Sequence, residues 1–206
     1  MIDVAAFGGI KQITLNRPDK ANALTEQMLR DLIAAVDGAK DAAAVILTGE
    51  GRVFSAGADL DAARAGLAVS PLWEELSSAI AALPGLCIAA LNGTVAGGAT
   101  GMALACDLRI AVPEAKFFYP VMKHGFLPQP SDPVRMTALI GPARTKWMLL
   151  AGQKATSEQA LSFGLIDEVL PQDDLMARAH ELCADCIAAD EATAHAIKRL
   201  CPNQRR

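Results

Sequence analysis

The most informative part of the sequence for predicting the fold is Leu83–Ala111, LPGLCIAALNGTVAGGATGMALACDLRIA. Its apolar run Leu86–Leu91 predicts a buried strand, because it is short and ends at a turn. A helix of small residues is then expected over Gly97–Cys106, and a second strand over Leu108–Val112. The strand–helix–strand order predicts a βαβ unit, in which the two strands are parallel.

The flanking sequence continues this alternation. The expected strands and helices, in chain order, are a strand over Lys11–Asn16, a helix over Thr25–Ala39 that Thr25 caps, a strand over Ala44–Thr48 and a helix over Pro71–Leu83 with Pro71 in its first turn. From Asp132 onward the pattern is helical, interrupted by the β-like piece Ile166–Leu170. No composition shift divides the chain, so residues 1–206 are expected to form one α/β domain.

Composition excludes several classes of protein. The chain has 206 residues, of which 52% are hydrophobic and 20% charged, and this is too apolar for intrinsic disorder. Its net charge of −4, without a basic stripe, argues against nucleic acid as a partner. The five cysteines are irregularly spaced and predict neither a disulfide framework nor a metal site. Free thiols favour a reducing compartment, so we expect a cytoplasmic protein.

The longest uncharged segment lies between Glu75 and Asp107. Asn92 and five glycines interrupt it, and such residues disfavour membrane insertion, so we expect a buried segment and no membrane span. The first residues, MIDVAAFGG, lack the basic region and apolar run of a secretory signal.

Three loops carry the chemical signal: Arg17–Leu24, Phe54–Leu60 and Asn92–Gly101. The second and third consist of small residues, which let a backbone approach a ligand closely. Gly97 and Gly98 open the expected helix, and free N–H groups at such a position stabilise a developing oxyanion. The alternative is that this glycine pair only allows tight packing of a helix on a sheet. The spacing fits no dinucleotide-binding, nucleophile-elbow or phosphate-loop motif.

Four segments together resemble the crotonase superfamily, which has the enoyl-CoA hydratase/isomerase fold. They are ITLNRPDKANAL, VILTGEGRVFSAGADL, the stretch quoted first, and LIGPARTKWMLLAGQKATSEQALSFGLIDEVLP, and the match runs from about Lys11 to Lys198. The resemblance implies a ClpP/crotonase-like fold, with a core of repeated ββα units over residues 1–131. Residues 132–206 would then be a helical region that is truncated relative to the family.

The resemblance also implies a ligand and its site. The ligand is an acyl-CoA thioester, and no separate cofactor is needed. The backbone N–H groups of Ala58 and Gly98 would form an oxyanion hole. The remaining substrate-binding residues implied are Lys20 and Ala21 beside the CoA phosphates, Ser55, Ala56, Asp59 and Leu60 along the CoA groove, and Gly97 and Val121. A homotrimer or hexamer is the implied assembly.

Two departures from the family matter for activity. Family hydratases hold their attacking water with two glutamates, whose positions here are Gly101 and Val121. Neither Gly nor Val transfers a proton, so neither ordinary hydratase activity nor an isomerase that relies on the second glutamate is expected.

Two nearby titratable residues are candidate replacements. Asp132 is one, with the alternative that it caps the helix that follows. His124 is the other, with the alternative of a solvated or packed imidazole. Tyr119 could place its hydroxyl in the pocket or pack in the core, and Gln129 stands where some family members carry an acid.

Three functions therefore stay open. The first is an enzyme that stabilises a thioester enolate, for isomerisation, decarboxylation or hydrolysis. The second is a non-catalytic acyl-CoA-binding protein. The third is a degenerate family member that serves as an oligomeric partner.

Overall fold

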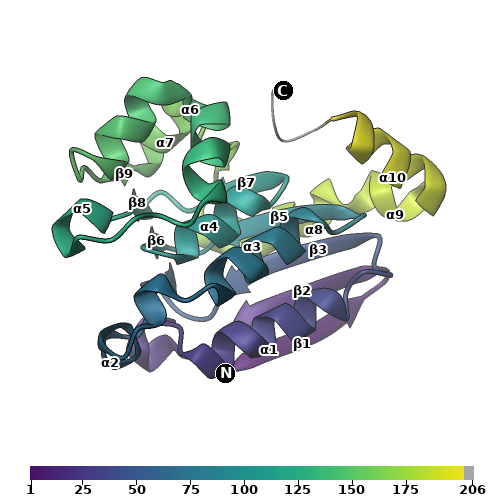
Figure 1. Ribbon diagram of the computed structural model, residues 1–206. Helices are drawn as coiled ribbons and strands as arrows, with labels where there is room; N and C mark the ends of the chain where they lie inside the picture. Colours follow the sequence, from purple (N-terminus) through teal and green to yellow (C-terminus); the bar gives the residue numbers. More distant parts are fainter. Residues whose placement is uncertain (202–206) are drawn as a thin grey trace.

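The protein folds into two β-sheets with helices packed around them (Figure 1). The computed structural model describes residues 1–201. The larger sheet has the order β1-β2-β3-β5-β7-β10, and the smaller has the order β4-β6-β8-β9. The strands are β1 (Ile2–Phe7), β2 (Ile10–Leu15), β3 (Ala44–Gly49), β4 (Val53–Ser55), β5 (Leu86–Leu91), β6 (Thr94–Ala96), β7 (Leu108–Ala111), β8 (Lys116–Phe118), β9 (Ala155–Thr156) and β10 (Glu168–Val169).

The helices follow the strands in a repeating pattern. They are α1 (Glu26–Asp37), α2 (Leu60–Arg64), α3 (Leu72–Ala81), α4 (Ala99–Ala105), α5 (Val121–His124), α6 (Ser131–Leu149), α7 (Ser157–Phe163), α8 (Gln172–Leu182), α9 (Ala184–Ala188) and α10 (Glu191–Leu200), with short 3-10 turns at Pro18–Lys20 and Leu67–Val69. In the units β3-β4-α2, β5-β6-α4 and β7-β8-α5, the first strand joins the large sheet and the second joins the small sheet. This repetition is the ββα architecture that the family resemblance implies.

The expected strands and helices are present, with ends that differ from the expected bounds by at most two residues. Thr25 caps α1, because its hydroxyl accepts a hydrogen bond from the Met28 N–H at 3.3 Å. Pro71 stands at the N-terminus of α3. The uncharged stretch is buried as predicted, and every residue from Cys87 to Leu91 in β5 is inaccessible to solvent.

Five strands were not expected from the sequence: β1, β4, β6, β8 and β9. All but β1 have only two or three residues, too few for an apolar period to appear. The sheets are also not purely parallel, since β1 pairs with β2, and β8 with β9, in antiparallel register. The region after residue 131 is not only helical, because β9 and β10 extend the small and large sheets.

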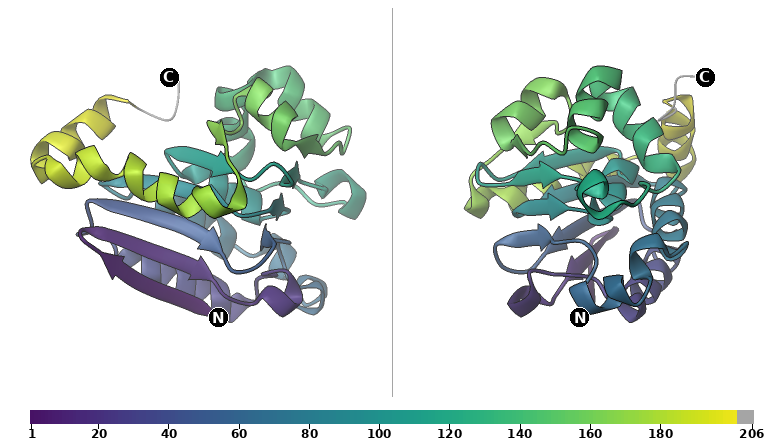
Figure 2. Two further views of the ribbon diagram at one scale, coloured as in Figure 1. Left: turned by 180° about the vertical axis from the view of Figure 1, so that it is seen from behind. Right: turned by 60° about the vertical axis from the view of Figure 1, so that its left-hand side comes forward.

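Helices cover the two faces of the large sheet unequally. On one face α1, α3 and α4 lie side by side (Figure 1). On the other face α8 packs against β5 and β7, as the view from behind shows (Figure 2). Within residues 1–201, no helix is long and apolar enough to span a membrane.

None of the cysteines in the described chain forms a disulfide. Cys87, Cys106 and Cys183 are buried, Cys186 is half-buried and Cys201 is exposed. Burial raises the pKa of the Cys183 thiol to about 11, which makes it unreactive. Among residues 1–201, no group of three or more His, Cys, Asp or Glu side chains could hold a metal ion.

Candidate active site

Two glycine loops touch at the ends of β4 and β6. A Cβ on Gly57 would lie 2.7 Å from the Ala96 carbonyl oxygen, and a Cβ on Gly97 would lie 3.7 Å from the Gly57 Cα. Both glycines have positive φ, of 87° and 56°, which other residues rarely adopt. The two glycines therefore allow the second and third loops to pack closely against each other.

The loops leave two backbone N–H groups free beside a cavity. Ala58 forms a parallel bridge with Leu24, but its neighbours Gly57 and Asp59 make both hydrogen bonds of that bridge. Gly98 precedes the first turn of α4, where no carbonyl is available to its N–H. Neither N–H donates to any residue within 1–201. Free donors of this kind can stabilise negative charge on an oxygen.

The first loop holds the second loop in place. The Asn22 amide donates to the carbonyls of Glu50 and Val53 at 2.9 and 2.7 Å, and its oxygen accepts from the Arg17 N–H. The buried Ser55 hydroxyl donates to the Asn22 carbonyl at 2.8 Å and accepts from the Gly57 N–H at 3.1 Å. These bonds fix the backbone on which Ala58 stands.

Asp59 is a structural residue of the second loop. It caps α2 and forms an ion pair with Arg17 at 2.8 Å. The hydrogen bond from Arg17 holds the pKa of Asp59 below its ordinary value.

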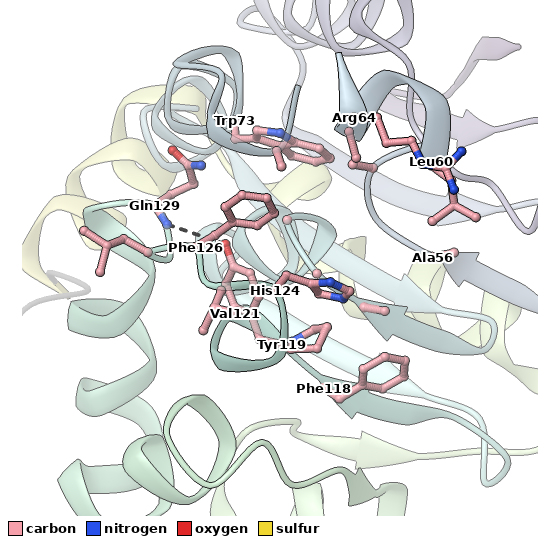
Figure 3. A pocket seen from close by; sticks show the side chains of 18 residues that line it. Ala56, Leu60, Arg64, Trp73, Phe118, Tyr119, Val121, His124, Phe126 and Gln129 are labelled. Carbon is pink, nitrogen blue, oxygen red and sulfur yellow. Dashed lines mark hydrogen bonds between the residues drawn. The ribbon is translucent and has the colours of Figure 1, made fainter. Parts of the chain in front are cut away.

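The cavity beside the free N–H groups has a volume of about 540 Å³ and mostly apolar walls (Figure 3). Six residues implied by the family resemblance line it, together with His124: Ala56, Ala58, Leu60, Gly97, Gly98 and Val121. Four implied residues, Lys20, Ala21, Ser55 and Asp59, do not line it, and neither does Asp132. The cavity therefore joins the second and third loops but not the first.

Sequence reasoning missed most of the apolar wall. The residues it did not single out include Ala63, Arg64, Ala68, Trp73, Phe118, Phe126 and Leu127. Trp73 lies under the third loop, and a Cβ on Gly98 would come within 2.8 Å of its ring. The sequence offered one signal for Trp73, namely that it is aromatic. Its place at the cavity depends on the packing of α3 against α4, which the sequence does not show.

Asp132 lies where a side chain at Gly101 would be. A Cβ built on Gly101 would be 2.7 Å from Asp132 Oδ1 and 2.9 Å from Oδ2. The alternative in which Asp132 caps a helix is wrong, because no side chain caps α6 and Asp132 turns inward. Its Oδ2 accepts a hydrogen bond from the Tyr119 hydroxyl at 3.0 Å, and its Oδ1 has no partner among the described residues.

Burial sets the protonation of this pair. It raises the pKa of Asp132 from 3.8 to about 7, against the Tyr119 hydrogen bond and the Arg135 charge, which lower it. Burial and the Asp132 charge both raise the pKa of Tyr119 far above its ordinary value. Burial would also raise the pKa of Glu74, but hydrogen bonds from Ser131 and the Arg135 charge outweigh it and hold that pKa low.

His124 lies at the end of α5, on the cavity wall and exposed to solvent. Its ring stacks on Phe126 with 6.4 Å between centroids. The titratable side chains on the cavity wall are Arg64, Tyr119 and His124, and no carboxylate lines it within the described chain.

Comparisons with known proteins agree with this architecture. The sequence profile of the family "Enoyl-CoA hydratase/isomerase" matches residues 6–204. The "Probable enoyl-CoA hydratase echA6" of Mycobacterium tuberculosis (strain CDC 1551 / Oshkosh) is 34% identical over 184 residues, covering 88% of this chain and 76% of that protein. A "Probable enoyl-CoA hydratase" of Rhodobacter capsulatus is 34% identical over 197 residues, covering 93% and 77%.

Solved structures give the same result. DspI of Pseudomonas aeruginosa superposes with a TM-score of 0.89 at 31% identity, over 97% of this chain and 85% of that chain. An enoyl-CoA hydratase of Bacillus anthracis superposes with a TM-score of 0.88 at 30% identity, over 96% and 81%. With its ββα repeats and its paired glycine loops, the chain belongs to the enoyl-CoA hydratase/isomerase family.

Proposed function

We propose that this protein binds an acyl-CoA thioester and stabilises its enolate. The observation that carries the proposal is the pair of free N–H groups, from Ala58 and Gly98, on the wall of one apolar cavity. The thioester carbonyl oxygen accepts from both groups. When the α-carbon loses a proton or a carboxyl group, the negative charge moves to this oxygen, and preorganised donors favour that state over the neutral carbonyl.

The first and second loops bind the CoA portion in this proposal. Ala56, Ala58 and Leu60 already line the cavity, and Lys20 and Ala21 lie on the neighbouring loop, which hydrogen-bonds to the second. The exposed Lys20 ammonium attracts the CoA phosphates. Ser55 and Asp59 contribute indirectly, because their hydrogen bonds hold the loop.

Hydration is the reaction that the site supports least. It requires a water held by two carboxylates, and the family positions for them are Gly101 and Val121. Decarboxylation and thioester hydrolysis require less of the protein, because carbon dioxide or water supplies part of the bond change. We therefore expect turnover of crotonyl-CoA by hydration to fall well below the usual enzymatic range of about 1–10³ s⁻¹.

A non-catalytic acyl-CoA carrier is the second candidate. The absence of any carboxylate from the cavity wall, within the described residues, favours it. Binding without turnover on every thioester tested would establish the carrier and exclude the enzyme.

Substitutions at Gly98 test the oxyanion hole. Gly98→Ala and Gly98→Pro both place a Cβ against Trp73, but only proline removes the N–H. If the protein is an enzyme, we expect turnover by Gly98→Pro to be about 10²–10³ lower than turnover by Gly98→Ala. If it is a carrier, we expect Gly98→Pro to bind acyl-CoA more weakly than Gly98→Ala does. Calorimetry with acyl-CoA and circular dichroism check binding and folding.

A backbone ester at Ala58 provides the test that does not depend on sterics. Replacing Ala58 by lactic acid exchanges the backbone N–H for an ester oxygen and keeps the side chain. Unchanged affinity and rate in this variant and in Gly98→Pro would contradict the oxyanion hole. Failure of wild-type protein to bind any acyl-CoA at about millimolar concentration would overturn the function itself.

We also propose a homotrimer or hexamer. In support, α10 buries none of its residues and exposes Ile197 and Leu200 at 58% and 81%. Light scattering that gives a monomer mass at micromolar concentration would refute it. The free cysteines support a cytoplasmic location, which cell fractionation tests.

A further inference from the structure

The geometry points to a two-residue proton relay, in which Tyr119 exchanges a proton with the bound substrate and the buried Asp132 exchanges it with Tyr119. The relay rests on the proposed function, because it acts on the thioester held by Ala58 and Gly98. Tyr119 is the catalytic residue of the relay, and Asp132 acts through it.

The first support is the position of the Asp132 carboxylate. Both of its oxygens lie within 2.9 Å of where a Cβ on Gly101 would be. Gly98 and Gly101 are three residues apart, which is a rise of about 4.5 Å along a helix. The carboxylate is therefore close to the oxyanion-hole amide, although it comes from α6 and not from α4.

The second support is the link from this carboxylate to the cavity. Asp132 does not reach the cavity wall, but Tyr119 does, and its hydroxyl donates to Asp132 Oδ2 at 3.0 Å. The Gln129 N–H, at 3.5 Å, donates to the same hydroxyl oxygen (Figure 3). A hydroxyl has two acceptor sites, so one remains free for a substrate proton.

The third support is that no structural role accounts for Asp132. It is completely buried, it does not cap α6, and its Oδ1 has no partner in the described chain. Arg135, the nearest cation in sequence, donates instead to the Ser77 hydroxyl at 2.7 Å. A buried carboxylate with one hydrogen bond is costly, and such groups are concentrated at functional sites.

The relay moves the double bond of a 3-enoyl thioester into conjugation, and every proton and electron pair in the reaction is accounted for. The Tyr119 oxygen takes the α-proton, its own proton passes to the Asp132 carboxylate, and the electron pair forms a dienolate whose oxygen is held by the two N–H groups. The Asp132 proton then returns to the Tyr119 oxygen, and the hydroxyl proton goes to the γ-carbon. The product is the conjugated 2-enoyl thioester, and both residues regain their starting states.

The surroundings of Asp132 bring its pKa close to neutral pH, so both its protonated and its ionised form are populated there. Burial and the Glu74 charge raise its pKa, the Tyr119 hydrogen bond and the Arg135 charge lower it, and together they place it at about 7. Because the relay starts from the carboxylate, isomerisation should increase as the pH rises through about 7. Tyr119 stays neutral throughout, since its pKa lies far higher.

The experiment uses 3-hexenoyl-CoA and follows the absorbance of the conjugated thioester. Tyr119→Phe removes only the hydroxyl, and Asp132→Asn keeps the shape of the carboxylate. Each should lower kcat by about 10²–10⁴, the range for an acid–base group, with KM little changed. The double variant should be no slower than the slower single variant, because both act in one step. Asp132→Asn should also lose the inflection near pH 7.

Gly101→Ala tests the same relay without removing a titratable group. Its Cβ pushes the carboxylate away from Tyr119, so kcat should fall while CoA-thioester affinity holds. Circular dichroism and calorimetry with hexanoyl-CoA verify folding and binding for every variant.

The outcomes separate the relay from the proposed function. Wild-type protein that binds hexanoyl-CoA but does not isomerise 3-hexenoyl-CoA overturns the relay and leaves thioester binding intact. Isomerisation that survives Tyr119→Phe but is lost in His124→Ala assigns the proton transfer to His124 and also overturns the relay. If no thioester binds, the proposed function fails first.

Discussion

Individual residues at the junction of α4 and α6 determine where the buried charge lies. Gly101 has no side chain, and the Asp132 carboxylate fills the space that one would occupy. A larger residue at position 101 would clash with the Asp132 carboxylate, so one of the two side chains would have to move. A side chain at position 101 and the Asp132 carboxylate therefore compete for the same space.

Asp132 should also make stability depend on pH. Its pKa is about 7 in the folded protein and near 3.8 when unfolded, so the native state binds the proton more tightly. The stability it contributes is complete below the unfolded pKa and is lost as the pH rises through about 7. Relative to Asp132→Asn, wild-type protein should lose up to about 4 kcal/mol between pH 4 and pH 8.

Urea unfolding of both proteins at several pH values measures this difference. The comparison with the asparagine variant removes the contributions of the other carboxylates, such as Asp59 and Glu168, whose pKa values are lowered. A difference that does not change with pH would show that Asp132 is not held as the structure shows.

Lys20 allows a prediction about the CoA phosphates. Lys20→Ala should weaken acyl-CoA binding about two- to fivefold, the range of an exposed ion pair, and more at low salt. Lys40→Ala is the matched control, because Lys40 is also exposed but pairs with Asp37 on the end of α1. Calorimetry with an acyl-pantetheine, which lacks the nucleotide phosphates, should show no effect of Lys20→Ala, and an equal loss would refute the assignment.

At the scale of elements, α6 joins the site to the rest of the C-terminal region. Its first turn carries Asp132 and Arg135 inward, and it then kinks at Gly141. Gly141 has φ 77° and ψ 164°, a conformation available essentially only to glycine. The kink turns the second half of α6 toward α7, so that Arg144 and Trp147 contact Phe163.

Gly141→Ala should destabilise the protein by about 1–3 kcal/mol. A Cβ there would meet no atom within 4 Å, so the whole effect would come from backbone strain. Ala143→Gly, in the exposed part of the same helix, is the control and should cost no more than about 1 kcal/mol. Thermal unfolding measures both, and equal losses would mean that the kink is not strained.

At the scale of the whole molecule, the cavity is assembled from segments far apart in the chain. Its wall comes from the second and third loops, α2, α3, β8, α5 and the segment after α5 (Figure 3). Leu60, Phe126 and Leu127 remain 74%, 40% and 86% exposed at its edge. Such exposed apolar residues around an apolar cavity fit a hydrophobic acyl chain.

Affinity should therefore rise with acyl-chain length. Each buried methylene contributes about 0.8 kcal/mol, so each added carbon should tighten binding roughly fourfold until the cavity is full. Calorimetry with saturated acyl-CoA thioesters from four to twelve carbons tests this. Affinity that is independent of chain length would place the acyl group outside the cavity.

The family, the alternation of the main strands and helices, and the two glycine loops can all be predicted from the sequence alone. These features are local: a buried strand such as Leu86–Leu91 shows as an apolar run, and a close backbone approach shows as glycine. The same reasoning identified Gly101 and Val121 as positions without an acid.

The positions of the remaining polar groups depend on tertiary packing and could not be predicted from the sequence. Asp132 reads locally as a helix cap, yet packing of α6 against α4 buries it on Gly101 and joins it to Tyr119. Ser55 and Asp59 read as ligand contacts, yet the first loop takes up their hydrogen bonds. Contacts between residues many positions apart leave no periodic pattern in the sequence, because they depend on how whole helices and loops pack.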